Sequence, residues 1–125
     1  MTGKLSVVEQ ANQTKKWKRV LDRLQQKNIV QKYYLAEMLK EYKGKDDFVL
    51  LAEQYQNQFL QQDEALRLMR IDVVALEDLA IKNECEKIHD HKKKLEKEMK
   101  AFRANFKRIS SEFTIFLLSV GSLCV

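Results

Sequence analysis

The fold is set by residues 35–52, LAEMLKEYKGKDDFVLLA, whose apolar positions mirror each other about Lys45. Tyr42 lies three residues before this centre and Phe48 three residues after it. On both sides the apolar residues are alternately four and three apart, which is the repeat of helices packed in a coiled coil. Gly44 suits the left-handed backbone conformation that commonly ends a helix. The stretch therefore predicts an antiparallel helical hairpin that turns at Gly44.

The mirror extends over eight core positions on each side of the turn, and the residue numbers of each pair add up to 90. The first arm comprises Trp17, Leu21, Leu24, Asn28, Gln31, Leu35, Met38 and Tyr42, and the second comprises Phe48, Ala52, Tyr55, Phe59, Gln62, Leu66, Met69 and Val73. Ser6 and Glu9 have the spacing of a capping box, which favours a helix start at Ser6. The pattern predicts helices at about 6–43 and 47–81.

A second apolar series with the same spacing runs from Cys85 to Phe116, but it is out of phase with the first by one residue. A turn near Asn83 explains the shift, and it places the series opposite the second helix in another regular antiparallel register. The sequence then predicts an all-α, up-down-up antiparallel three-helix coiled-coil bundle with a third helix at about 84–118. The alternative is a two-helix hairpin with one very long second helix, whose uncovered seam would require a dimer.

The composition of the 125 residues favours one helical domain over the whole chain, 1–125. There is no proline and there are three glycines, so few positions interrupt a helix. Two cysteines are too few for a disulfide framework, and neither a secretory signal nor a run of 18 apolar residues is evident. We therefore expect a cytoplasmic protein.

The net charge of +5 is distributed unevenly along the chain. Residues 1–44 carry ten basic and four acidic side chains, residues 45–82 carry four and eight, and residues 83–125 carry nine and six. An acidic middle helix between two basic helices is self-complementary, so much of the positive charge is expected to have an internal partner. Nucleic acid is therefore an unfavoured partner.

Two amides occupy facing core positions of the predicted hairpin. Asn28 and Gln62 form one of the mirrored pairs. A buried polar pair costs stability relative to leucine, but it fixes the register because a slip would leave both amides unpaired. We expect this pair to have a structural role.

Basic residues gather near Trp17, and others reach the same level if the first and third helices run parallel with Lys92 beside Trp17. The resulting basic collar comprises Lys15, Lys16, Lys18, Arg19, Lys93 and Lys94. Such a collar could meet an anionic membrane or nucleic-acid phosphates.

The C-terminal segment 117–125 is apolar and uncharged, and the register places it beyond the end of the bundle as an overhang. It could fold back, join a second subunit or contact a membrane surface. The candidate tail interface comprises Phe116, Leu117, Leu118, Val120, Leu123 and Val125.

No pattern in the chain indicates catalysis or a cofactor. Glu86 and His89 match a four-letter motif of di-iron bundles, but such sites need the motif on two inward-facing helices, and the chain has only two histidines, His89 and His91. The seam through Ile88 also turns Glu86 outward and leaves His89 on the flank. Cys85 and His89 supply too few ligands for a structural zinc site. We therefore expect neither an enzyme nor a metal protein. The sequence favours a helical scaffold or interaction module that binds a protein partner or itself.

Overall fold

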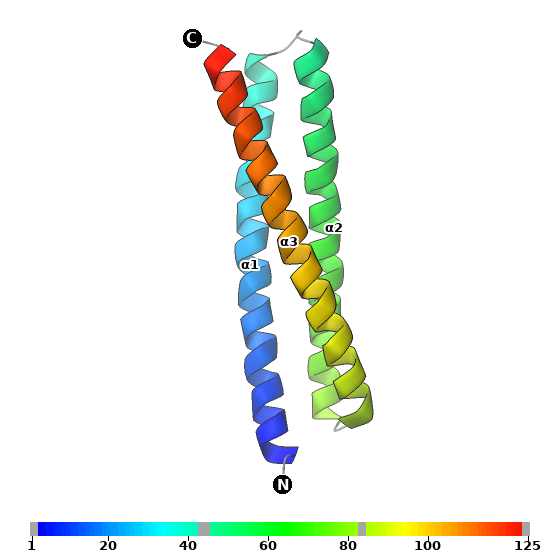
Figure 1. The fold of residues 1–125 in the computed structure, drawn as a ribbon. Coiled ribbons are helices and arrows are strands. Elements are labelled where there is room, and N and C mark those ends of the chain that lie inside the picture. The colour runs from blue at the N-terminus through cyan, green and yellow to red at the C-terminus, as the bar shows by residue number, and fades with distance from the viewer. Residues whose placement is uncertain (1–2, 43–45, 83–84, 124–125) are drawn as a thin grey trace.

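The computed structural model describes residues 3–42, 46–82 and 85–123, which form three long α-helices. They are α1 (Gly3–Glu41), α2 (Asp46–Ile81) and α3 (Cys85–Leu123), and they run up, down and up (Figure 1). The predicted three-helix fold is confirmed, and the alternative of one very long second helix is wrong. The turn positions Gly44 and Asn83 lie outside the described residues.

The register of the hairpin agrees with the mirror in the sequence. At the turn end, the rings of Tyr42 and Phe48 lie 5.1 Å apart. Near the other end, Lys18 Nζ lies 2.7 Å from Glu77 Oε1. Tyr42 and Phe48 are symmetric about Lys45, and Asp22 and Arg70, whose side chains lie 2.8 Å apart, are nearly so. The longer offset of Lys18 and Glu77 is within the reach of their extended side chains, so α1 and α2 stay in one register over most of their length.

The packing of α3 on α2 also follows the predicted register. At the C-terminal end of α3, Phe116 stacks on Phe48 with ring centroids 5.5 Å apart. At its N-terminal end, His91 Nε2 lies 3.2 Å from the carbonyl oxygen of Asp72. Contacts at both ends of the pair show that the one-residue phase shift marks a real change of helix.

Two helix ends differ from the sequence prediction. The first helix begins at Gly3 rather than Ser6, so Ser6 lies inside the helix and does not cap it. The third helix continues to Leu123 rather than 118. The longer third helix has a physical reason, because Val120 keeps the apolar spacing and is only 6% exposed.

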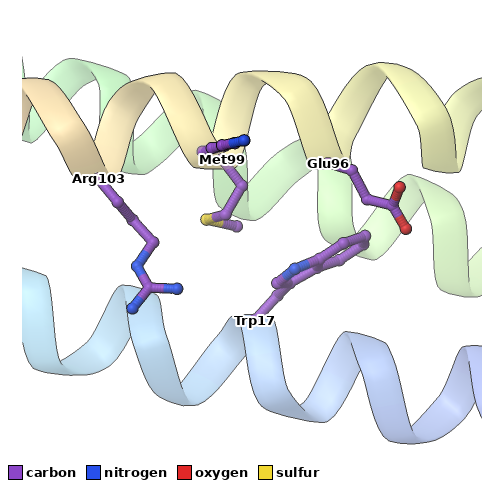
Figure 2. Close-up of a pocket in the computed structure, with 5 residues that line it drawn as sticks. Trp17, Glu96, Met99 and Arg103 are labelled. Atoms are coloured by element: carbon purple, nitrogen blue, oxygen red, sulfur yellow. The ribbon is translucent and has the colours of Figure 1, made fainter.

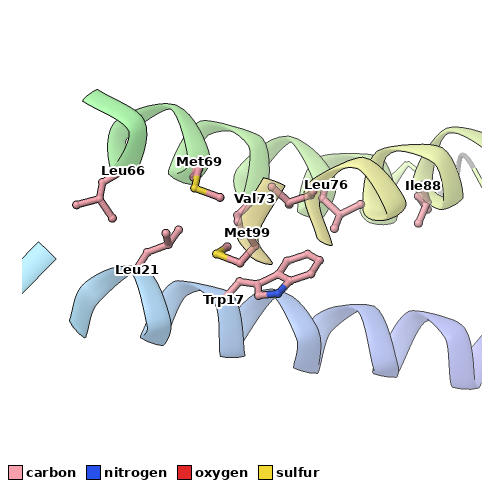
Figure 3. Close-up of a cluster of buried hydrophobic side chains, with 9 residues drawn as sticks. Trp17, Leu21, Leu66, Met69, Val73, Leu76, Ile88 and Met99 are labelled. Carbon is pink, nitrogen blue, oxygen red and sulfur yellow. The ribbon is translucent and has the colours of Figure 1, made fainter. Parts of the chain in front are cut away.

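The core is divided into two apolar clusters. The first lies around Trp17 near the N-terminal end of α1 (Figure 3) and comprises Trp17, Leu21, Leu66, Met69, Val73, Leu76, Ile88, Leu95 and Met99. The second lies near the turn between α1 and α2 and comprises Leu35, Ala52, Phe59, Ile109, Phe113, Phe116 and Val120. Buried amides occupy the positions between them on α1 and α2, so the core changes from apolar to polar and back along the rod.

Asn28 and Gln62 are both buried, but they are not hydrogen-bonded to each other. Asn28 Nδ2 donates to the Phe59 carbonyl oxygen at 3.0 Å and to Asp63 Oδ1 at 2.6 Å. Asp63 Oδ2 also accepts from Lys32 Nζ at 2.5 Å. Neither polar atom of the Gln62 side chain has a hydrogen-bond partner within the described parts of the chain. The register is therefore held by Asn28 and its partners on α2, and not by an amide pair.

Two residues of the C-terminal apolar segment, Leu117 and Val120, are covered by their own chain. Val120 belongs to the second core cluster and Leu117 packs against that cluster. Leu118, in contrast, is 67% exposed. The expected overhang is therefore wrong for Leu117 and Val120, because the tilt of α3 across the bundle brings them over the end of the hairpin. The side chain of Leu123 and the whole of Val125 lie outside the described part.

We predict that Gln62→Leu raises the free energy of unfolding by about 1–3 kcal/mol, because it removes two buried polar atoms that have no partner. Urea unfolding followed by circular dichroism measures this change. Asn28→Leu is the matched control and is expected to lower the free energy of unfolding, since it removes two hydrogen bonds. A loss of stability in Gln62→Leu would show that this amide is satisfied.

We predict that Val120→Ala lowers the free energy of unfolding by about 1–3 kcal/mol through the cavity that it leaves. Ile115→Ala is the matched control, because Ile115 is 64% exposed on the same helix, and its effect is expected to stay within about 0.5 kcal/mol. Equal effects in the two variants would contradict the packing of Val120 in the core.

Candidate functional site

Three cations at the contact between α1 and α2 are paired with carboxylates of the other helix. Lys18 of α1 pairs with Glu77 at 2.7 Å. Arg70 of α2 pairs with Asp22, the Nη2 and Oδ1 atoms lying 2.8 Å apart. Lys32 pairs with Asp63. These pairs join α1 to α2, so the charges along this side of the bundle are largely neutralised, as the charge distribution in the sequence predicts.

A different surface lies between α1 and α3. α1 packs along α2 and α2 along α3, while the direct contact between α1 and α3 is smaller. Figure 1 shows the cause, because α3 crosses α2 diagonally rather than lying parallel to α1. A hollow of about 260 Å³ opens between the two helices, with Trp17 of α1 facing residues of α3 (Figure 2). It is lined by Trp17, Glu96, Met99, Lys100 and Arg103.

A second hollow of about 620 Å³ adjoins the first and shares Glu96 and Lys100 with it. It is lined entirely by α3, through Lys93, Lys94, Glu96, Lys97 and Lys100. We call the surface of both hollows the basic groove. Its lining has five cations and one carboxylate, a net charge of +4.

The base of the basic groove is apolar. Trp17 is 6% exposed and Met99 is 3% exposed, so both belong to the core while one edge of each borders the hollow. A ligand in the groove would therefore meet apolar side chains below and cations at the rim.

The cations of the basic groove repel one another. Lys93, Lys97 and Lys100 are four and three residues apart, so they lie on one face of α3. Like charges at this spacing destabilise a helix by roughly 0.2–0.5 kcal/mol per pair. Within the described residues, only Lys94 of the five cations makes an ion pair, with Glu98 at 3.9 Å. An anion bound in the groove would relieve this repulsion.

The members of the predicted basic collar do not lie together in the structure. Lys93 and Lys94 line the groove, whereas Lys18 pairs with Glu77. The remaining members are exposed but line neither hollow; they are Lys15, Lys16 and Arg19. The expected level of α3 was also wrong, because Trp17 faces Glu96 to Arg103 rather than Lys92. The tilt of α3 moves these residues toward α1.

Three of the five cations of the basic groove were not predicted from the sequence: Lys97, Lys100 and Arg103. A signal for two of them was present, because Lys93, Lys97 and Lys100 have the spacing of one helix face. Arg103 has no such signal by itself. Its place opposite Trp17 depends on how α3 crosses the hairpin.

Two of the four described members of the predicted tail interface are buried. Phe116 is 7% exposed and Val120 is 6% exposed. Leu117 is half-buried. Of the described tail side chains only Leu118 is exposed, and Ile115 beside it is exposed as well. The described tail therefore supplies a small apolar spot rather than a continuous binding surface.

Outside the groove, the pKa shift of Tyr55 has a structural cause. Burial raises the pKa of the Tyr55 hydroxyl, and the negative charge of Glu112 adds to this effect. Glu86 and His89 are exposed, as the seam predicts. Over the residues that the structure describes, no three His, Cys, Asp or Glu side chains gather in a way that could hold a metal ion.

Comparisons with family models, with curated proteins and with solved structures found no match to this chain. None of the helices, over their described residues, holds an apolar stretch long enough to cross a lipid bilayer.

We predict that iodide quenches the fluorescence of Trp17 more strongly than caesium does, because the cations of the basic groove attract anions to the indole. Trp17 is the only tryptophan of the chain, so its emission reports on this groove alone. Lys100→Glu combined with Arg103→Glu should lower the ratio of the iodide and caesium quenching constants toward one. An unchanged ratio in this variant would show that the groove charges do not reach the indole.

Proposed function

We propose that the protein is a non-enzymatic helical interaction module that binds an acidic protein surface in the basic groove. The observation that carries the proposal is the contrast between two sides of one bundle. Where α1 and α2 meet, Lys18, Lys32 and Arg70 are paired with carboxylates of the other helix, whereas four of the five cations in the groove make no ion pair with a described residue. The proposal keeps the cytoplasmic location inferred from the sequence.

The apolar base of the groove favours a protein over a polyanion without apolar groups. Trp17 and Met99 offer contacts to aliphatic side chains, while Lys97 and Arg103 can pair with carboxylates. An amphipathic helix with acidic flanks presents both kinds of group on one face. Glu96 lies between the cations and would oppose a continuous phosphate backbone.

The length of the groove fits a short helical contact. From Lys93 to Arg103 the axis of α3 advances about 15 Å, or nearly three turns. A ligand helix of three to four turns would cover this distance. A contact of that size belongs to the smaller protein interfaces, so we expect micromolar affinity.

An anionic membrane or nucleic acid is a second candidate ligand. The observation in its favour is the run of exposed cations Lys93, Lys94 and Lys97 beside the groove. Phosphate binding would require these charges but not the apolar base, and its affinity would fall steeply with added salt. The two candidates therefore differ in what they require of Trp17 and Met99.

We predict that a labelled amphipathic peptide with leucines on one face and glutamates on its flanks binds the protein with micromolar affinity. Lys97→Glu combined with Lys100→Glu should weaken binding at least tenfold, because it reverses two charges at the rim of the groove. Fluorescence anisotropy at fixed ionic strength measures the affinity. Vesicles containing phosphatidylserine and a DNA duplex serve as the competing probes.

Lys15→Glu combined with Arg19→Glu is the matched control, since it changes the net charge equally on exposed positions that line neither hollow. This variant should bind the peptide as the unmodified protein does. Equal weakening by both variants would contradict the groove as the binding surface. Binding to vesicles or DNA without binding to the peptide would overturn the proposal in favour of the second candidate.

A further inference from the structure

Trp17 is a core residue that keeps one polar atom within reach of a ligand. Its place in the apolar repeat of α1 buries the ring, and only 6% of the residue is exposed. The indole Nε1 has no hydrogen-bond partner among the described residues, and unlike the amide atoms of Gln62 it is not sealed inside the core. A buried tryptophan usually gives this donor a partner. Because Trp17 lines the hollow between α1 and α3, a ligand in that hollow can supply the missing acceptor.

Two cations of α3 line the same hollow. Lys100 and Arg103 are three residues apart, so they share one face of that helix. Neither makes a hydrogen bond or an ion pair with a described residue. The guanidinium group offers a fixed fork of N–H donors, the ammonium group offers rotatable ones, and neither group can accept. Apart from the carboxylate of Glu96, the polar side-chain groups of this hollow are therefore all donors.

Glu96 does not neutralise these donors. Lys100 lies one turn beyond it, at the spacing that favours an ion pair, but the two form none. In Figure 2 Glu96 lies on the side of the six-membered ring of Trp17, while the indole nitrogen is at the opposite edge, toward Arg103. From Glu96 to Arg103 the axis of α3 advances about 10 Å. The hollow is therefore polarised, and an anion at its Arg103 end is kept away from Glu96.

The hollow also has an apolar wall and room for the stem of a side chain. Met99 is 3% exposed and lies between Glu96 and Arg103 in Figure 2. The volume of about 260 Å³ is large compared with the roughly 30 Å³ that one water molecule occupies in the liquid. An aliphatic stem would contact Met99 and the indole, while a terminal carboxylate would reach the donors. A glutamate side chain combines these two parts.

We propose that the Arg103 end of this hollow is an anchor site for one glutamate side chain of the acidic helix that binds in the basic groove. The indole N–H of Trp17 and the guanidinium group of Arg103 donate to its carboxylate, and Lys100 adds a further charged donor. This inference rests on the proposed function and deepens it, because it gives one residue of the partner a fixed place in the groove.

The test follows the indole N–H signal of Trp17, the only tryptophan, by NMR of the isotope-labelled full chain. The ligand is the acidic amphipathic peptide, acetylated and amidated so that its side chains supply all of its carboxylates. Because a new hydrogen bond to a carboxylate moves the proton signal to lower field, we expect a downfield shift that saturates together with peptide binding.

Replacing the glutamates of the peptide by glutamine, one at a time, identifies the anchor. One replacement should weaken binding about tenfold and remove the downfield shift, since it removes charge-assisted hydrogen bonds. Each of the others removes only a solvent-screened charge, so it should weaken binding less than about threefold.

Variants of the protein remove the donors one by one. Trp17→Phe keeps an aromatic ring without the N–H, and Arg103→Gln removes the guanidinium group, so each should weaken peptide binding about tenfold. Arg103→Lys keeps the charge but not the fork of donors, so it should recover only part of the affinity. Arg23→Gln is the matched control, because Arg23 is exposed on α1 and lines neither hollow, and it should bind as the unmodified protein does.

Circular dichroism establishes that each variant is folded, and the titration of the unmodified chain decides the matter if Trp17→Phe unfolds. Peptide binding with an unmoved indole signal, or equal weakening by every glutamine replacement, would overturn the anchor site and leave the proposed function intact. A downfield shift caused by inorganic phosphate but not by the bound peptide would overturn glutamate as the occupant. Absence of any peptide binding would overturn the proposed function, and the anchor site with it.

Discussion

The whole bundle depends on the packing of α2 against both of its neighbours. Its core positions meet α1 in one antiparallel register and α3 in another, as the Tyr42–Phe48 and Phe48–Phe116 contacts show at the turn end. α1 and α3 make a smaller contact with each other. A change in the register of α2 would therefore displace both outer helices at once, and the groove lies where α1 and α3 make little direct contact.

Polar groups inside the core make this register specific. Asn28 donates to the Phe59 carbonyl oxygen and to Asp63, and a slip of either helix would break both hydrogen bonds. Gln62 makes no comparable contact within the described structure. Apolar stripes alone tolerate shifts by a heptad, whereas a buried amide with two partners does not. The buried amides thus lower the stability of the fold, but they make the register of α1 against α2 unique.

The distribution of charge follows from the same arrangement. The acidic middle helix lies between two basic helices, and pairs such as Lys18–Glu77 neutralise the charges where α1 and α2 meet. α3 also has an excess of positive charge, but its Lys100 and Arg103 line the hollow beside Trp17 of α1 and its Lys97 lines the adjoining hollow. Repulsion among these cations is tolerated because solvent screens it, and an acidic ligand would remove it.

The sequence by itself determined the three helices, their directions and most of their core. These features follow from the spacing of apolar residues, which local helix geometry converts directly into a buried stripe. It also indicated Lys93 and Lys94 as members of a basic surface. Only the tertiary structure decided that Trp17 faces Glu96 to Arg103 and that Val120 is covered. The crossing of α3 over the hairpin sets both, and it results from side-chain packing between distant segments, which a linear repeat does not encode.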